Sequence, residues 1–428
     1  MQLKIAASLV AATGALLGGA SGPSIAAEKV DKWKFDTSVA YYGESDRVQD
    51  GSAKMLAVRT FDGSVLTLRA VLDTLTGASA NGAVQSSLPQ TFSNPSGGGD
   101  YRINPGDIPL DPTFQDTRLA VSANWLRPIG SRYEIDLGAS ASKEYDYLHT
   151  GVNARINRDL GRRNTRLTFG VAFAADSIDP DGGTPLAFRM MLPEMDDDDD
   201  PNPSKTGSES KTVADLFLGV TQVFGKRTIG QLNYSLSASS GHLSDPYKVL
   251  SVLDPVSGDP VAGPPGMNLY LYENRPDERT KHSLFGMIKH KFGRQVVDGS
   301  YRYMTDDWDV VSHTLDFHWR SPIGANWYVQ PHLRYYTQTA ADFYRPYLLD
   351  GDPLPDHATA DYRLGDMDGQ TLGVKVGRLL GAGREYSARL EYYQQSGTSP
   401  PGSSFGSLDQ FDLFPSVDAI IVQVGYRF

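Results

Sequence analysis

Charged residues in this chain recur at every second position of short apolar runs, a spacing that places them on one face of extended strands. Asp316 and Arg320, for example, alternate with Leu315, Phe317 and Trp319. If such strands close into a barrel, charges of both signs line its lumen and can discriminate solutes by charge. The same charges can instead pair with one another and close a narrow interior, so two interpretations stay open. The candidate lumen-lining residues are Arg118, Arg155, Arg302, Arg320, Arg334, Arg389, Glu134, Asp136, Asp298, Asp316, Glu385 and Glu391.

A second polar group stands where an expected strand enters a long connection. It comprises Asp73, Thr74, Thr76 and Asn81. Small polar side chains at this place could bind an ion or hold a folded loop in the mouth of a barrel. Ordinary turn chemistry, in which such side chains cap their own backbone, is the competing interpretation.

The connection that follows, at about 76–112, differs from the other long connections because it has no acid before Asp100. It contains many turn-forming residues, and its Leu88 and Phe92 need burial. We therefore expect an inward-folding loop that narrows or plugs the lumen, anchored by Asp73, Thr74 and Asn81.

The sequence carries no recognisable catalytic motif. It has no nucleophile elbow, no phosphate-binding loop and no dinucleotide fingerprint. His313 and Ser283 could imitate the pair used by outer-membrane hydrolases, but no supporting acid or amide is evident. None of the eight histidines has metal-site spacing along the chain, although His318 and His332 are expected on neighbouring strands, facing inward. That pair could respond to protons or metal, or simply form hydrogen bonds in the wall. We expect no enzyme activity, no cofactor and no metal.

The elements that must position these residues are strands, because a helix would scatter the alternating charges and aromatic residues around its circumference. Short turns and long Pro-, Gly-, Asp- and Ser-rich connections alternate along the sequence. The pattern predicts an all-β, transmembrane antiparallel β-barrel of sixteen strands, with short periplasmic turns and long extracellular loops. The expected strands are 33–43, 48–60, 64–75, 114–127, 132–145, 147–159, 165–177, 212–223, 228–240, 281–292, 295–306, 308–320, 327–338, 370–380, 385–396 and 417–428.

Two alternatives remain at this stage. Fourteen or eighteen strands are possible, and the second strand is the weakest because Gly51–Lys54 interrupts its pattern. A soluble periplasmic β-sandwich or propeller is the other alternative, although soluble sheets rarely need aromatic residues at so many strand ends.

The N-terminus predicts export from the cytoplasm. Lys4 is the only charge before Glu28, the apolar stretch runs from Ile5 to Leu17, and a small-residue cleavage site ends at Ala26. Residues 1–26 therefore read as a signal peptide and 27–428 as the mature barrel, with an N-terminal membrane helix as the alternative. The absence of cysteine excludes disulfides, and the net charge of −11 argues against nucleic-acid binding.

The C-terminal strand ends on aromatic residues. Tyr426 and Phe428 share one face with the apolar residues of this segment. An apolar outer face suits a bilayer, and a terminal aromatic residue is typical of the assembly signal of outer-membrane barrels. The expected partners are therefore outer-membrane lipid and the barrel assembly machinery.

The stretch Asp73–Ala83, followed by Gln90–Phe92, resembles a family of outer-membrane barrels known by its domain-of-unknown-function number, 3570. The resemblance implies a secreted barrel of about this length and no settled activity. Genes of the family tend to sit beside those for a flavin-transferring enzyme, a thioredoxin-like protein and a tiny lipoprotein. The expected function is a porin-like transport or translocation role. The alternative is a sheath or docking conduit for a periplasmic or surface lipoprotein or a flavoprotein.

Overall fold

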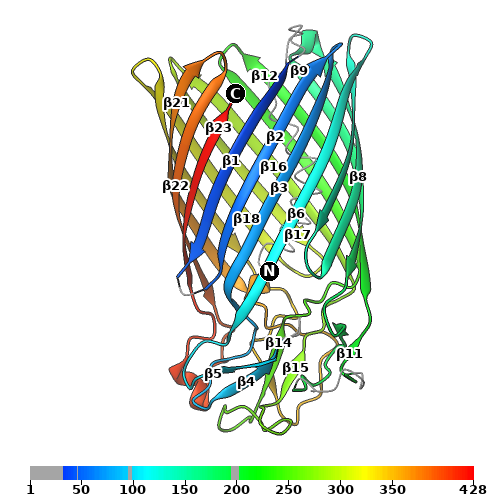
Figure 1. The fold of residues 1–428 in the computed structure, drawn as a ribbon, viewed down its shortest axis with the longest axis vertical. Coiled ribbons are helices and arrows are strands. Elements are labelled where there is room, and N and C mark those ends of the chain that lie inside the picture. Colours follow the sequence, from blue (N-terminus) through cyan, green and yellow to red (C-terminus); the bar gives the residue numbers. More distant parts are fainter. Residues whose placement is uncertain (1–31, 46, 95–98, 194–201) are drawn as a thin grey trace.

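Sixteen antiparallel strands form a closed barrel in the computed structural model, which describes residues 32–45, 47–94, 99–193 and 202–428 (Figure 1). The predicted signal peptide, residues 1–26, lies outside the described residues. The strands of the wall are β1 (Trp33–Glu44), β2 (Gln49–Phe61), β3 (Ser64–Ala80), β6 (Leu110–Ile129), β7 (Tyr133–Lys143), β8 (Tyr147–Leu160), β9 (Thr165–Ile178), β12 (Glu209–Gly225), β13 (Thr228–Gly241), β16 (Glu278–Phe292), β17 (Gln295–Asp306), β18 (Val311–Ile323), β19 (Trp327–Gln338), β21 (Asp366–Gly381), β22 (Arg384–Thr398) and β23 (Val417–Arg427).

The first and last strands close the wall. Val39 of β1 lies opposite Val424 of β23, and Phe35 and Phe428 exchange backbone hydrogen bonds of 2.8 and 2.9 Å. Closure removes the free edges that would otherwise leave backbone groups unsatisfied in a bilayer. All sixteen predicted strands are confirmed in order, and the counts of fourteen and eighteen are wrong.

The two faces of the wall differ as the alternation requires. Large apolar side chains such as Leu119, Phe169 and Leu390 are exposed on the outer face. The residues that alternate with them point inward and include charged ones such as Arg118 and Arg389. An exposed apolar band is the surface that lipid tails require. The described helices are short 3₁₀ turns, η1 (Gly161–Arg163), η2 (Tyr362–Leu364) and η3 (Gly406–Gln410), and none of them could cross a membrane.

Aromatic rings gather where the chain ends. The ring centroids of Tyr386 and Tyr426 are 4.3 Å apart, those of Tyr426 and Phe428 5.0 Å, and those of Phe428 and Phe35 5.2 Å. This stack joins β22, β23 and β1 at the seam of the barrel, so the predicted assembly residues also help to close the wall.

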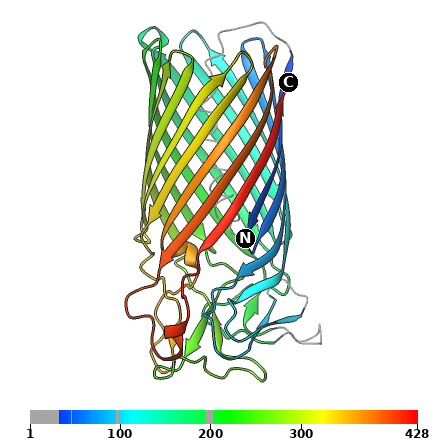
Figure 2. The ribbon, with the colours of Figure 1, turned by 90° about the vertical axis from the view of Figure 1, so that its left-hand side faces the viewer.

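The five long connections gather at one end of the barrel and cover it, as two perpendicular views show (Figures 1 and 2). We call this part the cap. It consists of the described residues of 81–109, 179–208, 242–277, 339–365 and 399–416. Its small strands are β4 (Gln90–Ser93), β5 (Asp100–Ile103), β10 (Thr184–Pro185), β11 (Lys205–Thr206), β14 (Val249–Leu253), β15 (Tyr270–Tyr272) and β20 (Leu348–Leu349).

The cap has a hydrophobic core of its own, centred on β14. All five residues of β14 are buried, and the strand lies between β15 and β20 in a three-stranded sheet. Phe92 from the first long connection is 0% exposed and packs against Tyr270 of β15. The long connections are therefore a folded unit rather than independent loops.

The expected loop at about 76–112 needs correction in its extent and its place. Strand β3 continues to Ala80 and β6 begins at Leu110, so the connection is 81–109. Its strands β4 and β5 lie in the cap beyond the end of the wall, not inside the barrel (Figure 1). Phe92 is buried as expected but by other connections, whereas Leu88 is 47% exposed. Neighbouring loops offer apolar surface that the polar lumen does not.

Candidate functional site: the lumen wall and its cap

The structure places all twelve candidate lumen residues on wall strands, at positions that alternate with the outward apolar residues. Several form ion pairs between adjacent strands. Arg118 Nε donates to Asp73 Oδ2 at 2.8 Å, and Arg155 pairs with Asp136. Arg166 of β9 reaches across β8 and lies 2.8 Å from Glu134 of β7. Opposite charges therefore alternate around this part of the wall, and no single sign dominates it.

Near the short-turn end, one carboxylate collects several cations. Glu385 lies 3.9 Å from Arg320 and 3.8 Å from both Lys375 and Arg427, and it accepts a hydrogen bond from the Tyr328 hydroxyl. The Arg320 guanidinium also sits 3.6 Å from the centre of the Tyr328 ring, a cation–π contact. Three cations thus surround the single carboxylate of Glu385, so this part of the wall is locally positive.

A row of lumen residues crosses five adjacent strands in register. Asp298 lies opposite His318, His318 opposite His332, His332 opposite Gly373, and Gly373 opposite Glu391. The prediction that the two histidines are neighbours is confirmed, and their rings stack at 4.2 Å with 4° between their planes. Gly373 matters because a Cβ there would lie 2.5 Å from Glu391 Cγ. The missing side chain lets Glu391 reach across β21 to His332.

The four loop candidates do not form one site. Asp73 is buried in the wall with Arg118, whereas Thr74 and Thr76 are exposed on the opposite face of β3. Thr74 therefore cannot anchor a loop in the mouth of the barrel, because strand alternation turns it outward. Asn81 lies in the cap, where its amide nitrogen donates to the Tyr101 hydroxyl at 2.9 Å.

A buried charge network ties the cap together. Its members are Asp245, Lys248, Glu273, Arg275, Asp361 and Arg363. Arg275 contacts Glu273 at 2.6 Å and Asp361 at 2.8 Å, so it joins connection 242–277 to connection 339–365. Arg363 then contacts Asp361 at 2.8 Å and Asp245 at 2.6 Å.

The network also reaches the wall, because the Lys248 ammonium donates to the carbonyl of Ala80 at the end of β3. Three cations face three carboxylates, which is the balance that burial requires. The sequence analysis did not identify this network, because its charges come from three separate parts of the chain, near 245–248, 273–275 and 361–363.

The carboxylates of the network differ in acidity. Burial raises the pKa of Glu273 to about 7, and the nearby Asp245 and Asp361 add to the effect, against the opposing influence of Arg275. Burial opposes ionisation of Asp361 too, but Arg363 and Arg275 outweigh it and hold the pKa of Asp361 below its ordinary value. Glu273 is therefore the carboxylate of the network whose charge changes near neutral pH.

We expect the cap to loosen as the pH rises from 5 to 8. In the closed cap, Glu273 keeps its proton up to about pH 7, whereas the pKa of a glutamate exposed to water is 4.5. The closed state thus binds more protons between these values, and the stabilisation present below pH 4.5 is lost as the pH passes 7. Protease cleavage of the cap, followed against pH, measures this effect. Glu273→Gln should flatten the profile, and Glu278→Gln, at an exposed position, should not. A wild-type profile with the opposite slope would contradict the prediction.

The resemblance of His313 and Ser283 to a hydrolase pair does not survive in the structure. His313 lies on β18 and Ser283 on β16, with β17 between them. The strand alternation turns His313 outward, where it contacts the Tyr301 hydroxyl at 2.7 Å, and turns Ser283 into the lumen. The two side chains therefore cannot act on one substrate.

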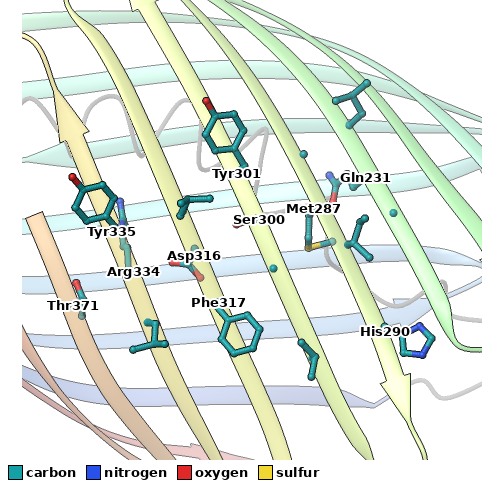
Figure 3. A pocket seen from close by; sticks show the side chains of 18 of the residues that line it. Gln231, Met287, His290, Ser300, Tyr301, Asp316, Phe317, Arg334, Tyr335 and Thr371 are labelled. Carbon is teal, nitrogen blue, oxygen red and sulfur yellow. The ribbon is translucent and has the colours of Figure 1, made fainter.

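The outer face of the wall has an apolar hollow over strands β12, β13, β16, β17, β18, β19, β21 and β22 (Figure 3). Tyr301, Phe317 and Tyr335 stand on its neighbouring strands, while Gly286 and Gly299 leave space between them. The hollow faces the side on which the apolar band is exposed, so lipid tails are the expected filling rather than a solute from the lumen.

The closed sheet, the apolar outer face and the charged lumen define a transmembrane β-barrel of the outer-membrane type, with short turns on the periplasmic side and long loops outside. The chain belongs to the family described as "Protein of unknown function (DUF3570)", which matches residues 6–428.

Solved structures with a similar fold include three bacterial outer-membrane proteins. The ferric enterobactin receptor PfeA in complex with BCV-L6 has a TM-score of 0.44 and 9% identity, and the match covers 93% of this chain and 61% of the receptor. A bacterial polysaccharide outer membrane secretin has a TM-score of 0.44 and 8% identity, covering 93% and 99% of the two chains. A loop-deletion mutant of OmpT from Vibrio cholerae has a TM-score of 0.38 and 9% identity, covering 93% and 98%. No curated protein matches the chain.

Proposed function

We propose that this protein resides in the outer membrane and translocates a small polar solute through its lumen, with the cap as its gate. The observation that carries the proposal is the pairing of a charged lumen wall with a folded cap over one end. Sixteen-stranded barrels are wide enough for an aqueous channel. A lumen lined with both signs of charge offers partners to polar solutes without excluding either sign.

The cap argues for a gated pathway rather than a permanently open one. Its core and its charge network are buried, and the cavity at the seam between Ala83, Tyr344 and Leu413 measures 40 Å³. That volume holds roughly one or two water molecules. We infer that passage requires the cap to move, which would break the contacts that Arg275 makes with Glu273 and Asp361.

A second function remains, in which the barrel is a docking conduit for a partner in the periplasm. The partner would be a flavoprotein or a small lipoprotein, as the gene neighbourhoods of the family suggest. The observation that favours it is the charged short-turn end, where Arg427 and Asp36 pair at 3.0 Å and remain exposed. Among the described residues, the connections at that end are short turns, which leave its rim accessible.

Purified protein in planar bilayers tests the transport role. We expect low conductance from the wild type and higher conductance once the cap is loosened, because the wall itself is polar. Failure of both forms to conduct would contradict transport. Co-purification of a flavin-bearing partner with a barrel that does not conduct would favour the conduit instead.

A further inference from the structure

We propose that the lumen wall binds a divalent transition-metal ion between His318, His332 and Asp316. The ligand atoms of these three residues lie within 4.8 Å of one another. Two imidazoles with a carboxylate suit ions such as Zn²⁺. The site lies on β18 and β19, apart from the cap, and the inference does not rest on the proposed transport role.

The distances fit ligands around one ion. His318 Nδ1 is 3.0 Å from Asp316 Oδ1, and His332 Nε2 is 3.2 Å from Asp316 Oδ2. Asp298 offers a further oxygen, 3.4 Å from His318 Nδ1. Two ligand atoms bound tetrahedrally to Zn²⁺ lie about 3.3 Å apart. The two imidazole rings are parallel in this structure, so at least one ring must turn out of the stack to direct its nitrogen at a shared ion.

His332 lies between two carboxylates. Its Nε2 is 3.2 Å from Asp316 Oδ2, and its Nδ1 is 2.8 Å from Glu391 Oε1. An imidazole can bind a metal through one nitrogen while its other N–H donates to a carboxylate. With the ion on Nε2, Nδ1–H would donate to Glu391.

This arrangement also supplies the outer support that metal-bound histidines use. A ligating histidine commonly donates its other ring N–H to a carboxylate, which fixes the ring. Glu391 takes that position because Gly373 leaves it room to cross β21. Glu391 is thus a positioning residue rather than a ligand.

Two of the three cations near the site pair with carboxylates other than Asp316. Lys289 lies 3.6 Å from Asp298, Arg389 lies 3.6 Å from Glu391, and Arg334 stands opposite Asp316 on β19 (Figure 3). Lys289 and Arg389 thus already compensate the outer carboxylates. Asp316 lies between the two histidines and is the carboxylate that would carry the ion.

The test is an isothermal calorimetric titration of the purified barrel with Zn²⁺, after a chelator has removed any bound metal. We expect about one Zn²⁺ per chain for the wild type. His318→Ala and His332→Ala should each abolish this binding. The matched control is His313→Ala, because His313 lies on the same strand but faces outward. Heat-modifiable migration in gels would establish that every variant is folded.

Two further variants test the support from Glu391. Glu391→Gln and Gly373→Ala should each weaken Zn²⁺ binding by about 10- to 100-fold, the usual effect of losing an outer partner. Co²⁺ in place of Zn²⁺ should give a visible absorption band that His332→Ala removes. Absence of binding in the wild type, or unchanged binding in the folded His318→Ala/His332→Ala double variant, would overturn the proposal.

Discussion

Arg275→Met should open the cap while the barrel stays assembled. Arg275 is buried between Glu273 and Asp361, and its loss leaves those two carboxylates without their shared cation. Removing one member of a buried ion pair costs about 3–5 kcal/mol. The wall does not depend on this residue, so gels should still show a heat-modifiable barrel. Conductance and protease cleavage within 242–277 should both rise.

The matched control is Arg345→Met, since Arg345 belongs to connection 339–365 but its side chain is exposed. It should leave conductance unchanged. Adding Asp361→Asn to Arg275→Met removes one of the stranded carboxylates, so the double variant should be less affected than the two single variants together predict. Closed, protease-resistant caps in the Arg275 variant would mean that the network does not hold the cap.

The wall could be predicted from the sequence because two independent signals agreed. Alternation with period two identified the strands, and turn residues separated them. The strand ends were less certain. Strand β3 was expected to stop at Leu75 but continues through Thr76 to Ala80, because backbone pairing persists beyond the apolar band. The alternation of apolar and polar residues therefore indicates which part of a strand contacts lipid, but it does not indicate where the strand ends.

The cap could not be predicted, because its residues find their partners in other connections. Val249–Leu253 is buried on both faces and shows no alternation, so it gives no strand signal. Phe92 was correctly expected to be buried, but a sequence cannot say which surface covers it. The sequence therefore indicated the need for burial without indicating its direction.

The row of lumen residues from Asp298 to Glu391 could be predicted only in part. Strand pairing made His318 and His332 predictable neighbours, since one register fixes both faces. The reach of Glu391 to His332 was not predictable, because it depends on a glycine on the strand between them. Spacing along the chain can reveal metal ligands in a helix or a turn. The ligands on β18 and β19, and their support from β22, are recognised only once the register of the strands is known.

Removing residues 82–108 should raise conductance more than any single substitution in the cap. The ends are easily joined, because the backbone N–H of Asn81 donates to the carbonyl of Pro109 at 3.2 Å, so a short Gly-Ser turn can replace the segment. The deletion removes the buried Phe92. It also removes the backbone N–H of Val84, which donates to the Ser251 hydroxyl at 3.1 Å. It uncovers one side of β14, and the remaining connections can no longer exclude water from the cap.

Two substitutions in the same connection provide the graded comparison. Phe92→Ala removes a ring that is 0% exposed and should cost about 3–5 kcal/mol of cap stability. Leu88→Ala removes a side chain that is 47% exposed and should have little effect. Conductance should therefore rise from Leu88→Ala through Phe92→Ala to the deletion, while heat-modifiable migration stays normal in all three. If the deletion left both conductance and partner binding unchanged, connection 81–109 would take no part in closing the lumen, and the gate would have to be sought in 242–277 and 339–365 alone.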